Sequence, residues 1–353
     1  MDVETRKVQK VGYSTLVVSI PKQWVDEVGL KRGDTVTFEK EENGTLRLYP
    51  RVKREERRKI KATINTDLVE EPNLLLRILT GSYILGRDTM RVVSKDALRP
   101  QHLAEIRDCV SRLTGINVVE QTLKHMEILN FIDPTNFPVY SLMRRLHIIS
   151  SSMIEAGIKA LQDGKAELAA EVANMENEAD RIYWLIVRQL LLAVADRGVS
   201  KKMGIQSPLH IVGNRTVAKS LEEMADYAES LAADIGTLIK MADGGPDDKT
   251  VADLTDLTDK VLKIKDMAMD SLFDNNINLA NQAIEEVKEV ERRDEEAGRR
   301  ILETGSQVAT AVTLRSIYWS LRQIARYCDT LAEIAINRVL EAPSEVVQLE
   351  SME

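Results

Sequence analysis

The sequence is poor in cysteine, histidine and aromatic residues. Of its 353 residues, two are cysteines, four are histidines and 4% are aromatic. Two cysteines cannot form a disulfide framework, and no signal peptide is recognisable, so we expect a reducing, cytoplasmic setting. The histidines lack the Glu-x-x-His spacing of di-iron bundles, and neither a glycine-rich phosphate loop nor a G-x-S-x-G nucleophile motif is found. These absences argue against an enzyme.

Long hydrophobic runs are also missing. The longest apolar stretch, Ile182 to Ala195, is interrupted by Arg188 and Gln189 and is too short to span a bilayer. We therefore expect no direct insertion into a membrane, and any role there would come through a partner protein.

Charge is divided unevenly along the chain. Residues 1–62 hold 15 basic and ten acidic side chains, a net charge of +5, whereas the formal net charge of the whole chain is −8, which leaves −13 for the remainder. A basic segment on an acidic body suggests an anionic partner, and nucleic acid is the first candidate. The basic run from Arg51 to Lys61 fits that interpretation, but a solvated linker would have the same composition.

From residue 138 onward, the chain has the periodicity of long amphipathic helices. Apolar residues recur every three or four positions, and Gly164 and the stretch 243–246 interrupt the pattern. The segment 220–228 recurs in modified form at 320–328. This repetition predicts two tandem three-helix bundles. Their helices are expected at residues 138–163, 165–195, 208–240, 249–273, 279–303 and 307–340.

Shorter elements are predicted before residue 134. Residues 5–50 predict short strands around one helix at 22–28, which is too little chain for an independent core, so we expect this segment to dimerise. Residues 60–133 alternate strand and helix, which predicts a small α/β layer on one sheet. The fold class is therefore mainly α, with a small β-rich domain and an α/β connector before the bundles. The predicted domains are 1–50, 51–135, 136–243 and 246–342.

Two acidic pairs mark a candidate metal site. Glu176 and Asp180 stand four positions apart on one predicted helix, as do Glu222 and Asp226 on the next, so each pair projects from one helix face. If these helices pack antiparallel, four carboxylates converge, and their repulsion favours a bound cation. An all-oxygen site suits Mg²⁺, Mn²⁺ or iron, with zinc as an alternative. Two solvated acidic faces are the competing interpretation.

The second bundle departs from this acidic pattern. Relative to the apolar stripe, Glu222 and Asp226 fall away from the core, so the site is expected on the bundle surface. Arg322 and Arg326 replace these two acids in the second bundle. We expect that bundle to hold no metal, and one of the two arginines to pair with Asp294 or Glu295.

The alignment of the second acidic helix leaves two registers. The preferred register, which matches Glu178-Ala179 with Glu296-Ala297, gives the correspondences Asp294 with Glu176 and Gly298 with Asp180. The other register uses Glu291 and Glu295 as the acidic pair, but it puts Asp294 into the apolar stripe.

The repeated bundles with their acidic pairs resemble the PhoU family of phosphate-uptake regulators over about residues 138–341. The motifs that carry the resemblance are Glu176-Asn-Glu-Ala-Asp180 and Glu222-Glu-Met-Ala-Asp226. The resemblance implies multinuclear iron or zinc clusters on the bundle surface. It makes Glu176, Asp180, Glu222 and Asp226 the candidate metal ligands.

The N-terminal segment resembles the AbrB/SpoVT swapped-hairpin domains. The resemblance rests on Arg6-Lys-Val-Gln-Lys-Val-Gly12, Val18-Ser-Ile-Pro-Lys22 and Gly29-Leu-Lys-Arg-Gly-Asp34. It implies a homodimer formed by hairpin exchange and DNA contact through basic residues, although Tyr13 stands where many DNA-binding members carry arginine. Dimerisation alone is the alternative. The candidate DNA contacts are Arg6, Lys7, Lys10, Lys22, Arg51, Lys53, Arg54, Arg57 and Arg58.

Together the two resemblances, a combination familiar among archaeal PhoU-like proteins, imply a non-enzymatic negative regulator of phosphate uptake. It would act through transporter or signalling components, DNA, or both, with the phosphate ion read at the metal-loaded acidic face. The alternative function is a sequence-specific transcription factor of the AbrB type whose helical body binds a metal or effector. A metal-dependent enzyme is disfavoured, because no general base is recognisable.

Overall fold

The computed structural model describes residues 4–40, 44–50, 59–241, 247–303, 307–341, 343 and 347–348. They belong to two compact units, residues 1–58 and residues 59–353, and each unit is described separately.

The N-terminal unit consists of two hairpins around one short helix. Strands β1 and β2 pair antiparallel, and so do β3 and β4, but the two pairs form separate sheets. Helix α1 begins after Pro21 and ends at Gly29, whose φ of 65° is in the left-handed region that glycine adopts without strain. The elements are β1 Gln9–Val11, β2 Thr15–Val17, α1 Lys22–Val28, β3 Thr37–Lys40 and β4 Leu46–Tyr49.

This unit has no core of its own in the part that the structure describes. None of its described residues is buried. Large apolar side chains lie exposed on both hairpins, among them Val8, Val11, Leu16, Val18, Phe38 and Leu46. A segment with this much exposed apolar surface needs a partner surface to bury it.

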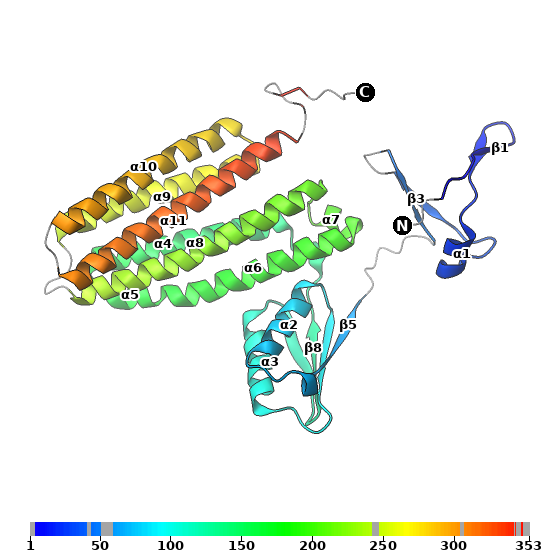
Figure 1. Cartoon of the computed structure of the whole chain (residues 1–353), viewed down its shortest axis with the longest axis horizontal. Helices are drawn as coiled ribbons and strands as arrows, with labels where there is room; N and C mark the ends of the chain where they lie inside the picture. The colour runs from blue at the N-terminus through cyan, green and yellow to red at the C-terminus, as the bar shows by residue number, and fades with distance from the viewer. Residues whose placement is uncertain are drawn as a thin grey trace. The chain divides into compact units, whose positions relative to one another are not determined.

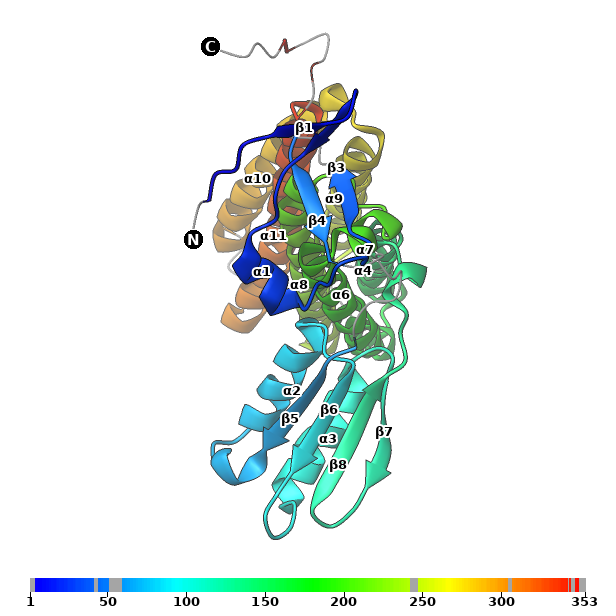
Figure 2. The same cartoon turned by 90° about the vertical axis from the view of Figure 1, so that its right-hand side faces the viewer.

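A small two-layer α/β domain opens the second unit. Its sheet has the order β5-β6-β8-β7, in which only β5 and β6 are parallel, and helices α2 and α3 cover one face (Figure 2). Alternate residues of β6 and β8, such as Met90, Val92 and Ile128, are buried under these helices. The elements are β5 Lys61–Asn65, α2 Leu74–Ile84, β6 Thr89–Val93, α3 Pro100–Arg112, β7 Ile116–Gln121 and β8 His125–Asn130.

The helical body follows as two three-helix bundles packed side by side (Figure 1). Helices α4, α6 and α8 form the first bundle, and α9, α10 and α11 form the second. One continuous apolar core runs through both. The helices are α4 Val139–Asp163, α5 Ala166–Ala170, α6 Val172–Ala195, α7 Arg197–Lys202, α8 Pro208–Met241, α9 Asp248–Asp274, α10 Ile277–Glu303 and α11 Val308–Val339.

Equivalent helices of the two repeats meet in the middle of the body. The start of α8 lies beside the end of α11, where Arg338 donates to Asn214 Oδ1 at 2.7 Å, so the two helices are antiparallel. Halfway along, the rings of Tyr227 and Tyr327 are 6.1 Å apart between centroids. These tyrosines occupy the same place in the repeated segment, so the two bundles are related by an approximate two-fold axis.

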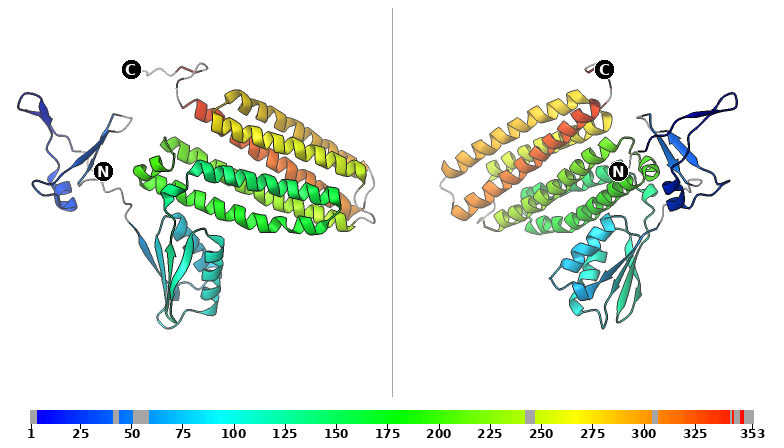
Figure 3. Two further views of the ribbon diagram at one scale, coloured as in Figure 1. Left: turned by 180° about the vertical axis from the view of Figure 1, so that it is seen from behind. Right: turned by 45° about the vertical axis from the view of Figure 1, so that its right-hand side comes forward.

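Buried polar groups also connect the two bundles. Helices α4 and α9 lie side by side (Figure 3), and Lys265 of α9 is fully buried there. Its ammonium donates to three groups of α4: His147 Nδ1 at 2.9 Å, the His147 carbonyl at 2.7 Å and Ser151 Oγ at 2.7 Å. A buried ammonium is tolerable only when all three protons are satisfied, as here. One of the scattered histidines therefore serves a structural role.

A buried arginine ties the α/β domain to the first bundle. Arg188 of α6 is 1% exposed and donates to the carbonyl of Tyr83 and, at 3.2 Å, to that of Arg87. Trp184, one turn earlier, packs against the core of the α/β domain. These contacts of Arg188 and Trp184 anchor the α/β domain on α6.

Most predicted elements are confirmed within a few residues. The exceptions lie in the first bundle, where the helix expected at 165–195 is divided at Glu171 into α5 and α6, and where the short helix α7 was not predicted. No helix in the described ranges combines the length and apolarity needed to cross a membrane.

Candidate metal centre

Three of the four predicted carboxylates converge between α6 and α8. Glu176 and Asp180 project from α6 toward Asp226 of α8, and one oxygen of each lies within 4.8 Å of the others. The four-residue spacing of each acidic pair and the pairing of α6 with α8 produce this arrangement, as predicted. Within the described residues, this is the one group of three or more potential metal-ligating side chains at such distances.

The cluster favours its protonated or cation-bound form. Partial burial, followed by repulsion from Asp180 and the other acids, raises the pKa of Glu176 to about 7. Burial, followed by the charge of Glu222, likewise raises the pKa of Asp226 to about 7. Burial also raises the pKa of Asp180, although Arg112 and Lys219 oppose the rise. A divalent cation would remove the repulsion that these shifts reflect.

The fourth predicted ligand, Glu222, is directed elsewhere. Its carboxylate forms an ion pair with Lys219, which also contacts Glu223 at 2.7 Å. Glu222 is only 8% exposed, so the expectation that it lies away from the core is wrong. That expectation rested only on the position of Glu222 relative to the apolar stripe. Lys219 makes the burial of Glu222 tolerable, because it supplies an opposite charge.

The chemistry of the three remaining donors fits a metal ion. All are carboxylate oxygens, which hard and borderline cations prefer, and their separation lets one ion contact all three. Glu176 and Asp180 are half-buried and Asp226 is partly exposed, which leaves room for water or an anion as further ligands.

The cluster also lies beside the α/β domain. Thr114, which follows α3, donates to the carbonyl of Arg181, the residue next to Asp180, at 3.3 Å. The charge of Arg112 at the end of α3 reaches Asp180 and opposes the rise in its pKa that burial causes. Sequence reasoning missed this neighbour, because nothing in the linear pattern shows where α3 ends relative to α6.

In the second bundle, arginines surround a buried acid between α10 and α11. Asp294 is fully buried, and Arg315 binds it through two nitrogens, one of them 2.9 Å from Oδ2. Arg322 adds a third contact at 3.2 Å, which confirms the predicted pairing with Asp294. Arg326 instead lies 4.0 Å from Glu291. Arg315 was missed at the sequence level.

These contacts favour the register that the sequence analysis set aside. Glu291 lies beside Arg322 and Arg326, as Glu176 lies beside Glu222 and Asp226. The register with Asp294 in the apolar stripe is therefore the structural one, and the preferred register is wrong. Arg315 and Arg322 explain why a carboxylate is tolerated there. In this register Asp294 stands at Ala179, Glu295 at Asp180 and Gly298 at Tyr183.

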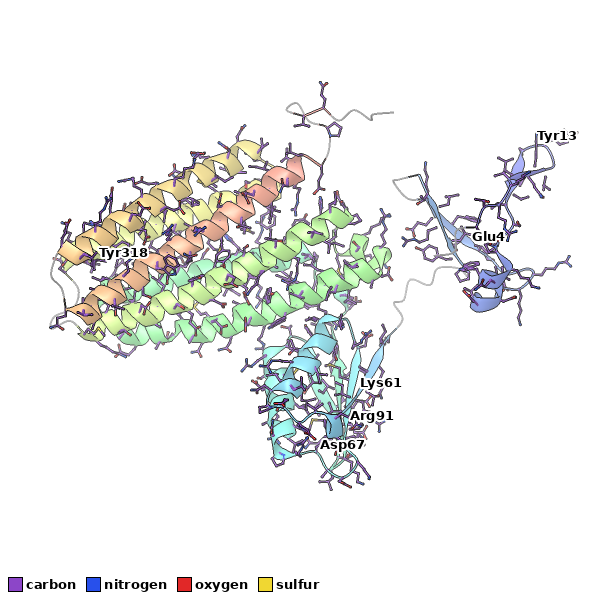
Figure 4. All side chains as sticks on the ribbon, in the orientation of Figure 1. Glu4, Tyr13, Lys61, Asp67, Arg91 and Tyr318 are labelled. Carbon is purple, nitrogen blue, oxygen red and sulfur yellow. The ribbon has the colours of Figure 1, made fainter. Side chains whose placement is uncertain are left out.

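The candidate DNA contacts fall partly within the described N-terminal unit. Lys7, Lys10 and Lys22 are exposed, and Arg6 forms an ion pair with Glu4. Tyr13 stands fully exposed at the turn between β1 and β2 (Figure 4). The remaining candidates, Arg51, Lys53, Arg54, Arg57 and Arg58, lie outside the described residues.

Comparison with known proteins identifies both parts of the chain. The sequence matches the PhoU domain twice, at residues 143–235 and 254–335. Residues 9–56 match the family described as antidote-toxin recognition MazE, bacterial antitoxin. No match was found among curated proteins.

Solved structures resemble the helical body. PhoU from Pseudomonas aeruginosa is 18% identical with a TM-score of 0.51, and the match covers 58% of this chain and 96% of that one. The phosphate transport system regulatory protein PhoU from Streptococcus pneumoniae is 11% identical with a TM-score of 0.47, covering 60% and 96%. The first likeness supports the fold of the body. With its two PhoU domains behind an N-terminal domain of the MazE and AbrB type, the chain belongs to the PhoU family.

Proposed function

We propose that this protein is a negative regulator of phosphate uptake. The proposal rests on the two PhoU domains, whose family consists of regulators of phosphate uptake. It acts by binding transporter or signalling components rather than by catalysis, as its membership of a family of regulators implies.

The observation that carries the mechanism is the convergence of Glu176, Asp180 and Asp226. We propose that these carboxylates hold a cation, with iron or zinc expected from the family resemblance and Mg²⁺ or Mn²⁺ as alternatives of the same oxygen-ligand chemistry. Phosphate would bind to the exposed side of the loaded cluster. Since the cluster borders the α/β domain at Thr114, a change in the charge of the cluster would also change the electrostatic potential at that domain.

The N-terminal unit supplies dimerisation in this proposal. Its described residues include no buried side chain, and its apolar residues are exposed on both hairpins, which supports pairing with a second copy. The exposed Lys7, Lys10 and Lys22 support DNA contact, which two copies would strengthen by avidity. A sequence-specific transcription factor is the second candidate function, favoured by the MazE-type match.

The test is phosphate uptake in the host organism. Cells that lack the protein are complemented with the native chain, with the triple variant Glu176→Ala, Asp180→Ala, Asp226→Ala, or with the control Glu167→Ala, Glu171→Ala. The control pair has the same four-residue spacing in the first bundle, but both residues are exposed and outside the cluster. We expect deletion and the triple variant to raise uptake in phosphate-replete medium, and the control to restore repression. Unchanged uptake on deletion would refute the proposal.

A further inference from the structure

In the first bundle, the ring of Tyr183 fills the groove between α6 and α8. Tyr183 is 3% exposed, and its hydroxyl accepts a hydrogen bond from Arg215 at 2.9 Å. The guanidinium carbon of Arg215 lies 5.3 Å from the ring centroid, in cation–π range. In the first bundle, an aromatic ring packed against an arginine therefore occupies the space between the two helices.

In the second bundle, the equivalent position has no side chain. The register set by Glu291 and the arginines of α11 puts Gly298 where Tyr183 stands, and Arg315 where Arg215 stands. A Cβ atom built at Gly298 would meet nothing closer than Arg315 Nε, at 3.7 Å. The missing ring therefore leaves space beside Arg315.

That space is a pocket of about 690 Å³, here named the Gly298 pocket. Its rim is apolar and exposed: Leu302 is 83%, Val308 80% and Val312 64% accessible. Arg315 forms part of the wall and is held in place by its bidentate contact with Asp294. The remaining lining residues are Asp294, Glu295, Arg299, Ile301 and Ala311.

We propose that the Gly298 pocket binds an aromatic side chain of a partner protein, which lies against Arg315 as Tyr183 lies against Arg215. A protein is favoured over a small molecule because the exposed rim extends beyond one ring and would bury apolar neighbours of the anchor. Aromatic anchors in pockets surrounded by such contacts dominate protein interfaces. Because Asp294 already fixes Arg315, little order is lost on binding. This site is separate from the proposed metal centre.

The first test uses p-cresol, the side chain of tyrosine, as a probe of the full-length protein. Methyl NMR should show saturable shifts at Ile301, Leu302, Val308 and Val312, and none at Val212, the counterpart of Val312 in the first bundle, which is 70% exposed. Gly298→Tyr, which supplies the ring internally, should abolish the shifts, whereas Gly298→Ala should retain them. Equal shifts in the native protein and Gly298→Tyr would overturn the proposal.

The second test identifies the occupant and does not depend on folding of the glycine variants. A photo-crosslinking amino acid replaces Val312 or, as the matched control, Val212, and the protein is illuminated in its host. We expect an adduct at position 312 alone, with a different protein, through a peptide containing an aromatic residue, and its loss when Leu302→Glu is added. Adducts with a second copy of this chain, or none with any protein, would overturn the proposal.

Discussion

The two hairpins α6–α8 and α10–α11 have one helix pattern and opposite electrostatics. Between α6 and α8, three carboxylates meet with pKa values raised toward neutrality. Between α10 and α11, a buried carboxylate is neutralised by Arg315 and Arg322. A repeated helix can therefore keep its packing while its polar positions change from a cluster of carboxylates to a carboxylate paired with arginines.

The comparison also shows how each site is balanced. Lys219 pairs with Glu222, whereas Glu176, Asp180 and Asp226 form no ion pair within the described residues. The charge of Lys219 offsets the two aspartates only in part, and that of Arg112 adds to it at Asp180. In the second bundle, Arg315 and Arg322 neutralise Asp294. Substitutions in either bundle can test this difference, and the predictions below run from the largest expected effect to the smallest.

Removing the buried acid should have the largest effect. Asp294→Ala leaves Arg315 and Arg322, which are 39% and 22% exposed, without their shared partner, and the loss of these charge-assisted hydrogen bonds should destabilise by about 2 kcal/mol. Glu295→Ala, at the next and exposed position, should cost less than about 0.5 kcal/mol. Chemical unfolding followed by circular dichroism measures both. Equal losses would contradict the account of Asp294.

The acidic pattern of the first bundle can also be introduced into the second bundle by substitution. The triple variant Asp294→Ala, Arg322→Glu, Arg326→Asp recreates the pattern of the first bundle, with an apolar residue at the Ala179 position and Glu291 and Glu295 opposite the new acids. We expect a second cation-binding site, seen as doubled metal content after dialysis. Metal content equal to that of the native protein would show that side-chain placement alone does not make the site.

Lys219 should weaken cation binding in the first bundle. Lys219→Gln removes a positive charge beside the cluster and frees Glu222 to join it. Because Lys219 is 45% exposed and screened by solvent, the expected gain in affinity for Mn²⁺ or Zn²⁺ is about threefold to tenfold. Isothermal titration calorimetry measures it, with Lys159→Gln as an exposed control. Weaker binding in Lys219→Gln would mean that Lys219 supports the site.

The pH dependence of stability should be the smallest effect, because Glu176 and Asp226 are both partly exposed and solvent screens their interactions. Glu176 and Asp226 bind protons more tightly in the folded protein, with pKa values of about 7 against ordinary values near 4. The metal-free protein should therefore lose stability as pH rises from about 4.5 to 7, because the folded state must release protons it holds favourably. The melting temperature in EDTA should fall less across this range in Glu176→Gln, Asp226→Asn. Identical slopes would contradict the raised pKa values.

The sequence predicted most of the architecture because the apolar period and the repeat are local signals. The acidic convergence was also predictable, since the four-residue spacing fixes helix faces. Contacts between segments far apart in the sequence were not predictable. The role of Arg315 and the true register of Asp294 depend on which side chains meet across helices. The pairing of Glu222 with Lys219, by contrast, is a local i,i+3 contact within α8 that the sequence pattern offered and that was overlooked. The carboxylate of Asp294 does not fit an apolar stripe, and only its contacts with Arg315 and Arg322 explain why it lies there.

The most direct test of the account is metal content measured by inductively coupled plasma mass spectrometry after exposure to Fe²⁺, Zn²⁺ or Mn²⁺ and dialysis. The native protein is compared with Glu176→Ala, Asp180→Ala, Asp226→Ala and with the control Glu167→Ala, Glu171→Ala. We predict that the native protein and the control retain metal and that the triple variant loses it, with the second bundle contributing none. Metal retained equally by all three proteins would contradict the central claim that the first bundle alone carries the cation site.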